Sequence, residues 1–101
     1  MGIKGLDEIC IYALVDPVQG IVRYVGQTAT PESRYKQHLS RKGEVGESER
    51  AKWIKTLRLA GRRPFMVLLD CVPKSEGPRA ENRWISHFLS IGVKLYNERL
   101  K

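Results

Sequence analysis

Two apolar, β-prone runs lie close together early in the chain, at residues 9–15 (ICIYALV) and 21–26 (IVRYVG). The five residues between them, DPVQG, are rich in turn formers, so we expect the two runs to pair as a β-hairpin. Pairing Val15 with Ile21 would set Tyr12 directly opposite Tyr24. Because side chains alternate along a strand, both phenols would then share one face of the hairpin, unless a bulge in the turn breaks the register.

A helix is expected directly after the hairpin. Thr30 suits an N-cap, and Pro31 suits the first helical position because its missing N–H is not needed there. Arg34, His38 and Arg41 then follow at positions i, i+4 and i+7. This spacing places the three side chains on one stripe of the helix surface.

The second half of the chain carries two more helical patterns and one apolar run. Ser48 can cap a helix over residues 49–60, and a further helix is expected over residues 78–90. Between them, residues 65–71 (FMVLLDC) form a nearly unbroken apolar run, typical of a central strand covered on both faces. The order β-β-α-α-β-α predicts an α+β fold: one domain over residues 1–101, with a small three-stranded central sheet flanked by helices.

Composition places the chain in the ordinary globular class, with 42% hydrophobic and 29% charged residues. The longest apolar run is too short to cross a bilayer and no secretory signal opens the chain, so we expect no membrane partner and a cytoplasmic location, nucleoid-associated, or nuclear if the protein is eukaryotic. Cys10 and Cys71 match no paired metal spacing. Since each falls within an expected strand, we expect free, buried thiols rather than a disulfide or zinc site.

Basic residues clearly outnumber acidic residues in the sequence. Lysine and arginine number 18 against 11 acidic residues, and residues 34–63 alone hold ten basic and three acidic residues. Such a segment indicates a polyanionic partner, since neutralising phosphates releases condensed counterions, although a solvated helical face would give the same pattern. The candidate nucleic-acid contacts are Lys36, Arg41, Lys42, Lys52 and Lys55.

Glu81 is the most informative single residue. It shares a helical stripe with Trp84, Ile85 and Phe88, at i, i+3, i+4 and i+7. An ionised carboxylate facing a core is costly unless it is paired or bound to a metal. The alternative is a carboxylate at the end of the stripe that reaches solvent or a nearby arginine.

Six short motifs occur in a fixed order along nearly the whole chain. An Ile-Tyr pair ends at Tyr12, a YVG element covers residues 24–26, an arginine is followed one helical turn later by a histidine, and a glutamate and an asparagine come last. Each motif is weak alone, but the order and spacing together resemble the GIY-YIG nuclease family. Cys10 and Val25 depart from the family's Gly and Ile. The matched positions are Tyr12, Tyr24, Gly26, Arg34, His38, Glu81 and Asn97.

The resemblance implies an endonuclease that hydrolyses DNA phosphodiester bonds and leaves a 5′-phosphate and a 3′-hydroxyl. It implies that Glu81 is the ligand of one Mg²⁺ or Mn²⁺ ion, with waters at most other positions. Arg34 would neutralise the phosphate. Tyr12 would act as general base, directly or through a water, once nearby positive charge favours its phenolate.

The remaining matched positions are implied to support this chemistry. Tyr24 would orient water or phosphate, and His38 would relay a proton or contact phosphate. Gly26 would let the backbone approach closely, and Asn97 would support the structure of the site.

Two other functions stay open at this point. A catalytically inactive DNA- or RNA-binding module of the same fold would share the basic segment, and so would a small ribosome-associated protein. The ribosome-associated protein does not explain Glu81, and the presence of all the matched polar positions favours an active nuclease over the inactive module. The choice of target stays open between two alternatives: a single-domain protein that acts on branched, flapped or damaged DNA in repair or recombination, and a catalytic domain whose target is chosen by a partner or by a further targeting domain.

Overall fold

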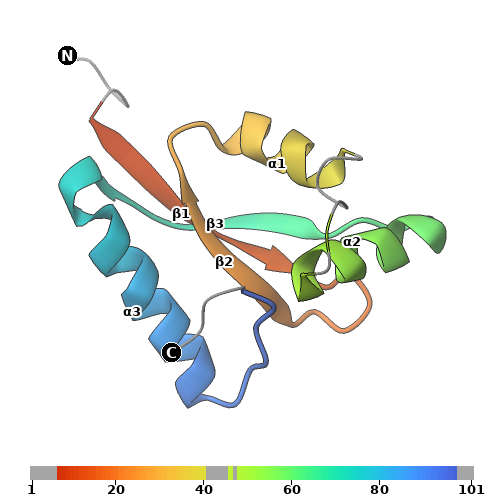
Figure 1. Ribbon diagram of the computed structural model, residues 1–101. Helices are drawn as coiled ribbons and strands as arrows, with labels where there is room; N and C mark the ends of the chain where they lie inside the picture. Colours follow the sequence, from red (N-terminus) through yellow and green to blue (C-terminus); the bar gives the residue numbers. More distant parts are fainter. Residues whose placement is uncertain (1–6, 41–45, 47, 98–101) are drawn as a thin grey trace.

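The computed structural model describes residues 7–40, 46 and 48–97. Three strands, β1 (Glu8–Val15), β2 (Val22–Thr28) and β3 (Phe65–Pro73), form an antiparallel sheet in the order β2-β1-β3 (Figure 1). Helices α1 (Pro31–Leu39), α2 (Glu49–Leu59) and α3 (Gly77–Ser90) flank it, with a short 3₁₀ turn, η2 (Lys74–Glu76), before α3. The predicted α+β class and the order β-β-α-α-β-α are confirmed.

The helix starts follow the local signals in the sequence. Pro31 occupies the first position of α1. The Ser48 side chain accepts a hydrogen bond from the Ala51 N–H at 3.1 Å, which satisfies one of the free N–H groups at the start of α2. None of the described helices has the length and apolarity needed to cross a membrane.

The two faces of the sheet carry separate cores. On one face, Tyr12 and Leu14 of β1 pack with the inner positions of α2. On the other, Ile11 and Val25 pack with α3 around Ala80. Because side chains alternate along a strand, consecutive residues of β1 and β2 serve different cores, and α3 lies on the opposite side of the sheet from α1 and α2 (Figure 1).

The predicted register of the hairpin is wrong by two residues. Val15 pairs with Val22 instead of Ile21, and the register shifts once more between Leu14 and Val15, so Tyr12 pairs with Gly26 and Tyr24 with Leu14. The displacement is two residues along β2, so the alternation is preserved and both phenols still lie on one face. Their ring centres are 6.1 Å apart.

The prediction that the 65–71 run forms the central strand is also wrong. β3 is an edge strand, and Phe65, Val67 and Leu68 are 59%, 45% and 52% exposed. β1 takes the central place because both neighbours pair with it. An unbroken apolar run fits a strand of either kind, and here the helices cover β1 and β2 more fully than β3.

The expectation of two free, buried cysteines is corrected by the pairing of β1 with β3. Cys10 and Cys71 face each other in the register and form a disulfide across 61 residues of sequence. Cys71 is exposed rather than buried. Spacing along the chain could not reveal the pair, because only the sheet brings the two strands side by side.

Candidate active site

Tyr12 is the centre of a hydrogen-bonded cluster between the sheet and α1. Its hydroxyl lies 2.8 Å from Nε2 of His38, and Nε of Arg34 donates a hydrogen bond to it at 3.3 Å. Tyr12 and His38 are buried, while Arg34 is half-buried. The turn of helix that separates Arg34 from His38 sets the two groups side by side above the phenol.

Arg34 determines the direction of one hydrogen bond in this cluster. A guanidinium can only donate, so the Tyr12 oxygen accepts from Arg34. The phenol keeps its proton and a second lone pair, so the tautomer of His38 decides which partner donates in the bond between them. Burial, aided by the charges of Arg34 and Arg50, lowers the pKa of His38 to about 3, which keeps the ring neutral.

The phenol itself is held in its protonated form. Burial and the neighbouring Tyr24 raise the pKa of Tyr12 above its ordinary value, and Arg34 opposes them through its hydrogen bond and its charge. The cluster thus contains a protonated phenol beside a neutral imidazole. Positive charge brought next to the phenol would lower the pKa of Tyr12 and favour its phenolate.

Tyr24 and Gly26 complete this part of the site from β2. The Tyr24 ring is half-buried and makes an edge contact with His38, with ring centres 5.4 Å apart. A Cβ atom on Gly26 would lie 2.6 Å from the Tyr12 hydroxyl, so only glycine leaves room for the phenol. The YVG element therefore supplies the Tyr24 ring to the cluster, and its glycine leaves the space that the Tyr12 phenol needs.

Arg50, in the first turn of α2, also faces the cluster, and sequence reasoning did not single it out. Its guanidinium carbon lies 5.7 Å from the centre of the Tyr24 ring. Its place within the basic segment is the one feature of the sequence that could have pointed to Arg50. The predicted nucleic-acid contacts were five other cations of that segment. Of these, Lys36, Lys52 and Lys55 are exposed on α1 and α2, whereas Arg41 and Lys42 lie outside the described residues.

Asn97 holds the outer edge of β2. Its side chain accepts from the Val25 N–H at 3.1 Å and donates to the Val25 carbonyl at 2.7 Å, as a neighbouring strand would. The Tyr96 N–H donates to the Arg23 carbonyl on the same edge. The end of the described chain thus supports β2 beside Tyr24 and Gly26.

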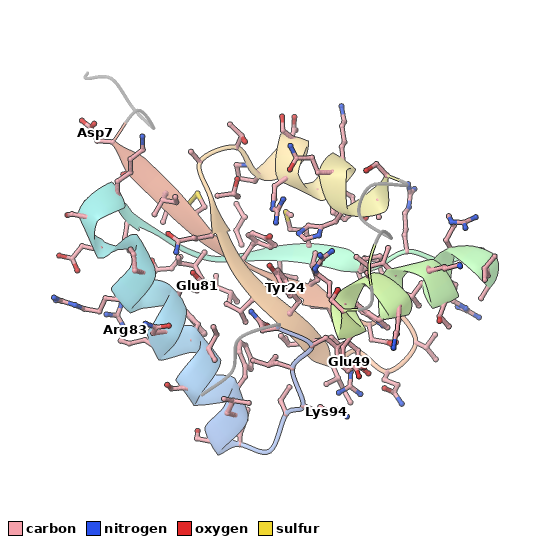
Figure 2. The ribbon with its side chains drawn as sticks, viewed as in Figure 1. Asp7, Tyr24, Glu49, Glu81, Arg83 and Lys94 are labelled. Atoms are coloured by element: carbon pink, nitrogen blue, oxygen red, sulfur yellow. A yellow bond between two sulfur atoms is a disulfide. The ribbon has the colours of Figure 1, made fainter. Side chains whose placement is uncertain are left out.

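Glu81 lies on the other side of β2 from the phenols (Figure 2). Its half-buried carboxylate accepts a 2.5 Å hydrogen bond from Nε2 of Gln27, the residue directly after Gly26. The alternative that Glu81 reaches a nearby arginine is not met at Arg79, two residues earlier on α3, which pairs with Glu76 at 3.7 Å. The structure therefore brings Tyr12, Tyr24, Arg34 and His38 together, and it places Glu81 across the edge strand that carries their glycine.

The donor set suits a weakly held, hydrated cation better than a closed metal centre. Across residues 7–40, 46 and 48–97, no three His, Cys, Asp or Glu side chains gather in a way that could hold a metal. Mg²⁺ is commonly held by one or two carboxylates, with waters and substrate phosphate at its other positions. Glu81 with its neutral amide partner fits that chemistry.

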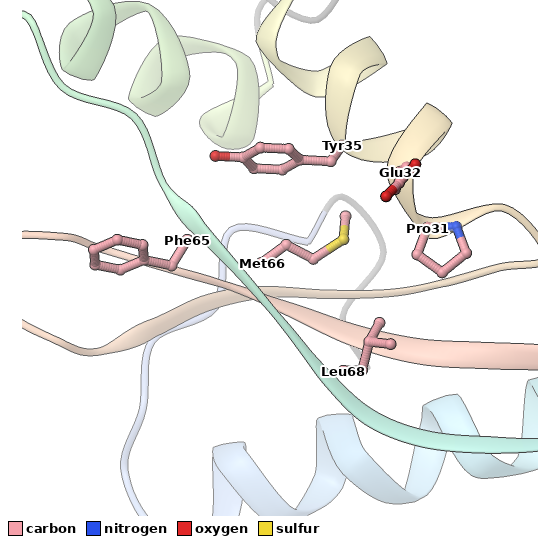
Figure 3. A pocket seen from close by; sticks show the side chains of 6 residues that line it. All are labelled: Pro31, Glu32, Tyr35, Phe65, Met66 and Leu68. Atoms are coloured by element: carbon pink, nitrogen blue, oxygen red, sulfur yellow. The ribbon is translucent and has the colours of Figure 1, made fainter.

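A separate pocket of about 340 Å³ lies between the start of α1 and β3 (Figure 3). Its lining is mostly apolar, with one carboxylate and no basic side chain. It therefore does not suit a phosphate, and we do not include it in the candidate site. Its lining residues are Pro31, Glu32, Tyr35, Phe65, Met66 and Leu68.

An antiparallel hairpin, a phenol–guanidinium–imidazole cluster on one of its faces and a carboxylate across its edge strand lie together in one compact α+β domain. The family model of the GIY-YIG catalytic domain matches residues 8–97, nearly the whole chain. The chain therefore belongs to the GIY-YIG family, a family of nucleases. Comparison with curated proteins and with solved structures returned no match.

Proposed function

We propose that this chain is a divalent-metal-dependent endonuclease that hydrolyses DNA and leaves a 5′-phosphate and a 3′-hydroxyl. The observation that carries the proposal is the Tyr12 hydroxyl, hydrogen-bonded to His38 and Arg34 within a domain of a nuclease family. A buried phenol needs hydrogen-bond partners that an apolar ring of the same size would not need. Here the partners are an imidazole, which can exchange a proton with the phenol, and a guanidinium, which favours the phenolate.

The roles of the clustered side chains follow from their exposure. Arg34 and Tyr24 are half-buried, so they can reach a phosphate or a water at the surface of the site. Tyr12 lies behind them and is buried, and it accepts a proton only after passing its own to His38. The base is thus a phenol–imidazole pair, and Arg34 neutralises charge on the phosphate while favouring the phenolate.

Glu81 would hold the Mg²⁺ or Mn²⁺ ion. The bound cation supplies neutralisation of the developing charge on the phosphate and the departing 3′ oxygen. The side chains of this chain have three roles. Glu81 holds the cation on one side of β2, and Arg34 binds the phosphate from the other side. Asn97 keeps β2 in place between them.

Contacts to the rest of the DNA would come from exposed cations on the side of the sheet that carries α1 and α2. Lys36, Lys52 and Lys55 lie there, and Arg41 and Lys42 are close to them in sequence. Such contacts give salt-dependent affinity without sequence choice. A partner or a further domain would therefore select the target.

Nicking of supercoiled plasmid with and without Mg²⁺ tests the proposal. The wild-type protein is expected to nick only with Mg²⁺ or Mn²⁺. Glu81→Ala should abolish nicking and leave salt-sensitive DNA binding nearly intact. Metal-independent nicking, or unchanged nicking by Glu81→Ala, would refute the metal assignment, whereas binding without nicking by the wild type would indicate an inactive binding module.

A further inference from the structure

Gln27 occupies a position that neither the motif pattern nor the proposed function explains. It follows Gly26 on β2, and the alternation of the strand turns its side chain to the face covered by α3. There its Nε2 donates to Glu81, with the nitrogen and oxygen 2.5 Å apart. Both side chains are half-buried, so the bond is partly shielded from water.

The first turn of α3 is shaped around the Gln27 amide. A Cβ atom on Gly77 would lie 2.4 Å from Oε1 of Gln27 and 2.9 Å from Cγ2 of Ile9. The φ angle of Gly77 is −55°, which any residue can adopt, so the backbone does not require glycine here. The absence of a side chain is what allows α3 to approach β2 so closely.

Gly77 and Glu81 are four residues apart, and therefore lie on the same face of α3. The Gln27 side chain contacts both: its oxygen side packs against Gly77 and its nitrogen bonds to Glu81. These two contacts fix the rotamer of Gln27, and with it the position of one oxygen of the Glu81 carboxylate. A neutral amide satisfies that oxygen without cancelling its charge, which leaves the charge for a cation.

We propose that Gln27, packed against Gly77, is a positioning residue that orients the Glu81 carboxylate to bind a divalent cation. The inference rests on the proposed function, because it takes Glu81 as the metal ligand. Partners that fix the orientation of a metal-binding carboxylate typically contribute ten- to a hundredfold in metal affinity or activity. The link also joins the two halves of the site, since Gly26 faces Tyr12 and the next residue faces Glu81.

Mn²⁺ titration of the ¹⁵N-labelled, DNA-free protein tests this inference without relying on activity. In the wild type, paramagnetic broadening should centre on the first two turns of α3 and on Gln27. Gln27→Met keeps the length of the side chain and removes the donor, and it should weaken Mn²⁺ binding about tenfold. Gly77→Ala should act in the same direction, because its methyl group displaces the amide, while alanine suits a helix better than glycine.

Three controls separate the outcomes. Gln19→Met, in the β1–β2 turn, should bind Mn²⁺ as the wild type does, and thermal unfolding of each variant reports whether it is folded. In nicking assays, the Gln27→Met enzyme should need about ten times more Mg²⁺ for half-maximal rate and recover most activity at saturation, which a general loss of structure would not produce.

The results distinguish this inference from the proposed function. If Glu81→Gln loses the site-specific broadening while Gln27→Met binds Mn²⁺ with wild-type affinity, the role of Gln27 is refuted and the metal site stands. If the wild type shows no broadening near α3, the metal assignment of Glu81 fails and the inference falls with it.

Discussion

The Tyr12 hydroxyl and Nε2 of His38 lie 2.8 Å apart, although 26 positions separate the two residues in the sequence. β1 supplies the phenol and α1 the imidazole, and Arg34 donates a hydrogen bond to the same phenolic oxygen. Two groups that can exchange a proton therefore lie in direct contact before any substrate is present.

Removing the Tyr12 hydroxyl should affect activity far more than the fold. We expect Tyr12→Phe to lower the single-turnover nicking rate by about 10²- to 10⁴-fold, the usual contribution of a general base. Tyr35→Phe is the matched control: it loses a hydrogen bond to the Pro64 carbonyl but should nick normally. Comparable rates in the two variants would exclude Tyr12 from proton transfer.

The buried imidazole of His38 should make stability depend on pH. Its pKa is lowered from 6.5 to about 3, so between these values the unfolded chain binds a proton that the folded chain does not. Stability is therefore full above about pH 7 and falls as the pH drops through 6.5, by about 2 kcal/mol between pH 7 and pH 5. Urea unfolding at the two pH values measures this. The difference should shrink in His38→Gln and persist in the exposed-site control His87→Gln.

Filling the gap at Gly26 should displace Tyr12. A methyl group there would lie 2.6 Å from the Tyr12 hydroxyl, and so Gly26→Ala must push the ring or the strand aside. We expect a loss of about 1–3 kcal/mol in the free energy of unfolding and a fall in the nicking rate of about 10²-fold, with DNA affinity retained. Wild-type nicking by a folded Gly26→Ala protein would show that the position of Tyr12 does not matter.

Asn97 should stabilise β2 through both of its bonds to Val25. Asn97→Asp keeps the shape but sets an acceptor against the Val25 carbonyl, and it should destabilise the protein by about 1–3 kcal/mol. Faster hydrogen exchange at the Val25 amide would locate the effect. The exposed Asn82→Asp change on α3 carries the same charge and should leave both measurements nearly unchanged.

The disulfide between Cys10 and Cys71 should contribute measurably to stability. It closes a 61-residue separation, and so reductant is expected to lower the free energy of unfolding by about 2–4 kcal/mol. Cys71→Ser should show the reduced value with or without reductant. A wild-type denaturation midpoint that is the same with and without reductant would contradict the prediction.

The elements were accessible from the sequence because their signals are local. The Ser48 cap, the proline that opens α1 and the apolar spacing of α3 each act within one or two helical turns. Alternation along the strands was also local enough to place Tyr12 and Tyr24 on one face. The strand pairing was less accessible, since a one-residue offset at Val15 and the irregularity next to Leu14 together moved Tyr24 two residues from its expected partner.

The candidate site was likewise predictable from the sequence only in part. The motif order identified Tyr12, Arg34, His38 and Glu81 as candidates, but their residue types do not say which are buried or where a proton points. Gln27 carried no signal at all, because a glutamine in a strand is unremarkable until a glycine and a glutamate from a distant helix close around it.

The sequence by itself determined the secondary structure, the family and which side chains are candidates for the chemistry, since all three depend on residue type and on spacing along the chain. Tertiary structure alone decided that β1 is central, that the two cysteines meet, that His38 is buried and neutral, and that Gln27 bonds to Glu81. Each of these depends on packing between segments far apart in sequence, where burial sets the charge state and direct contact sets the partner.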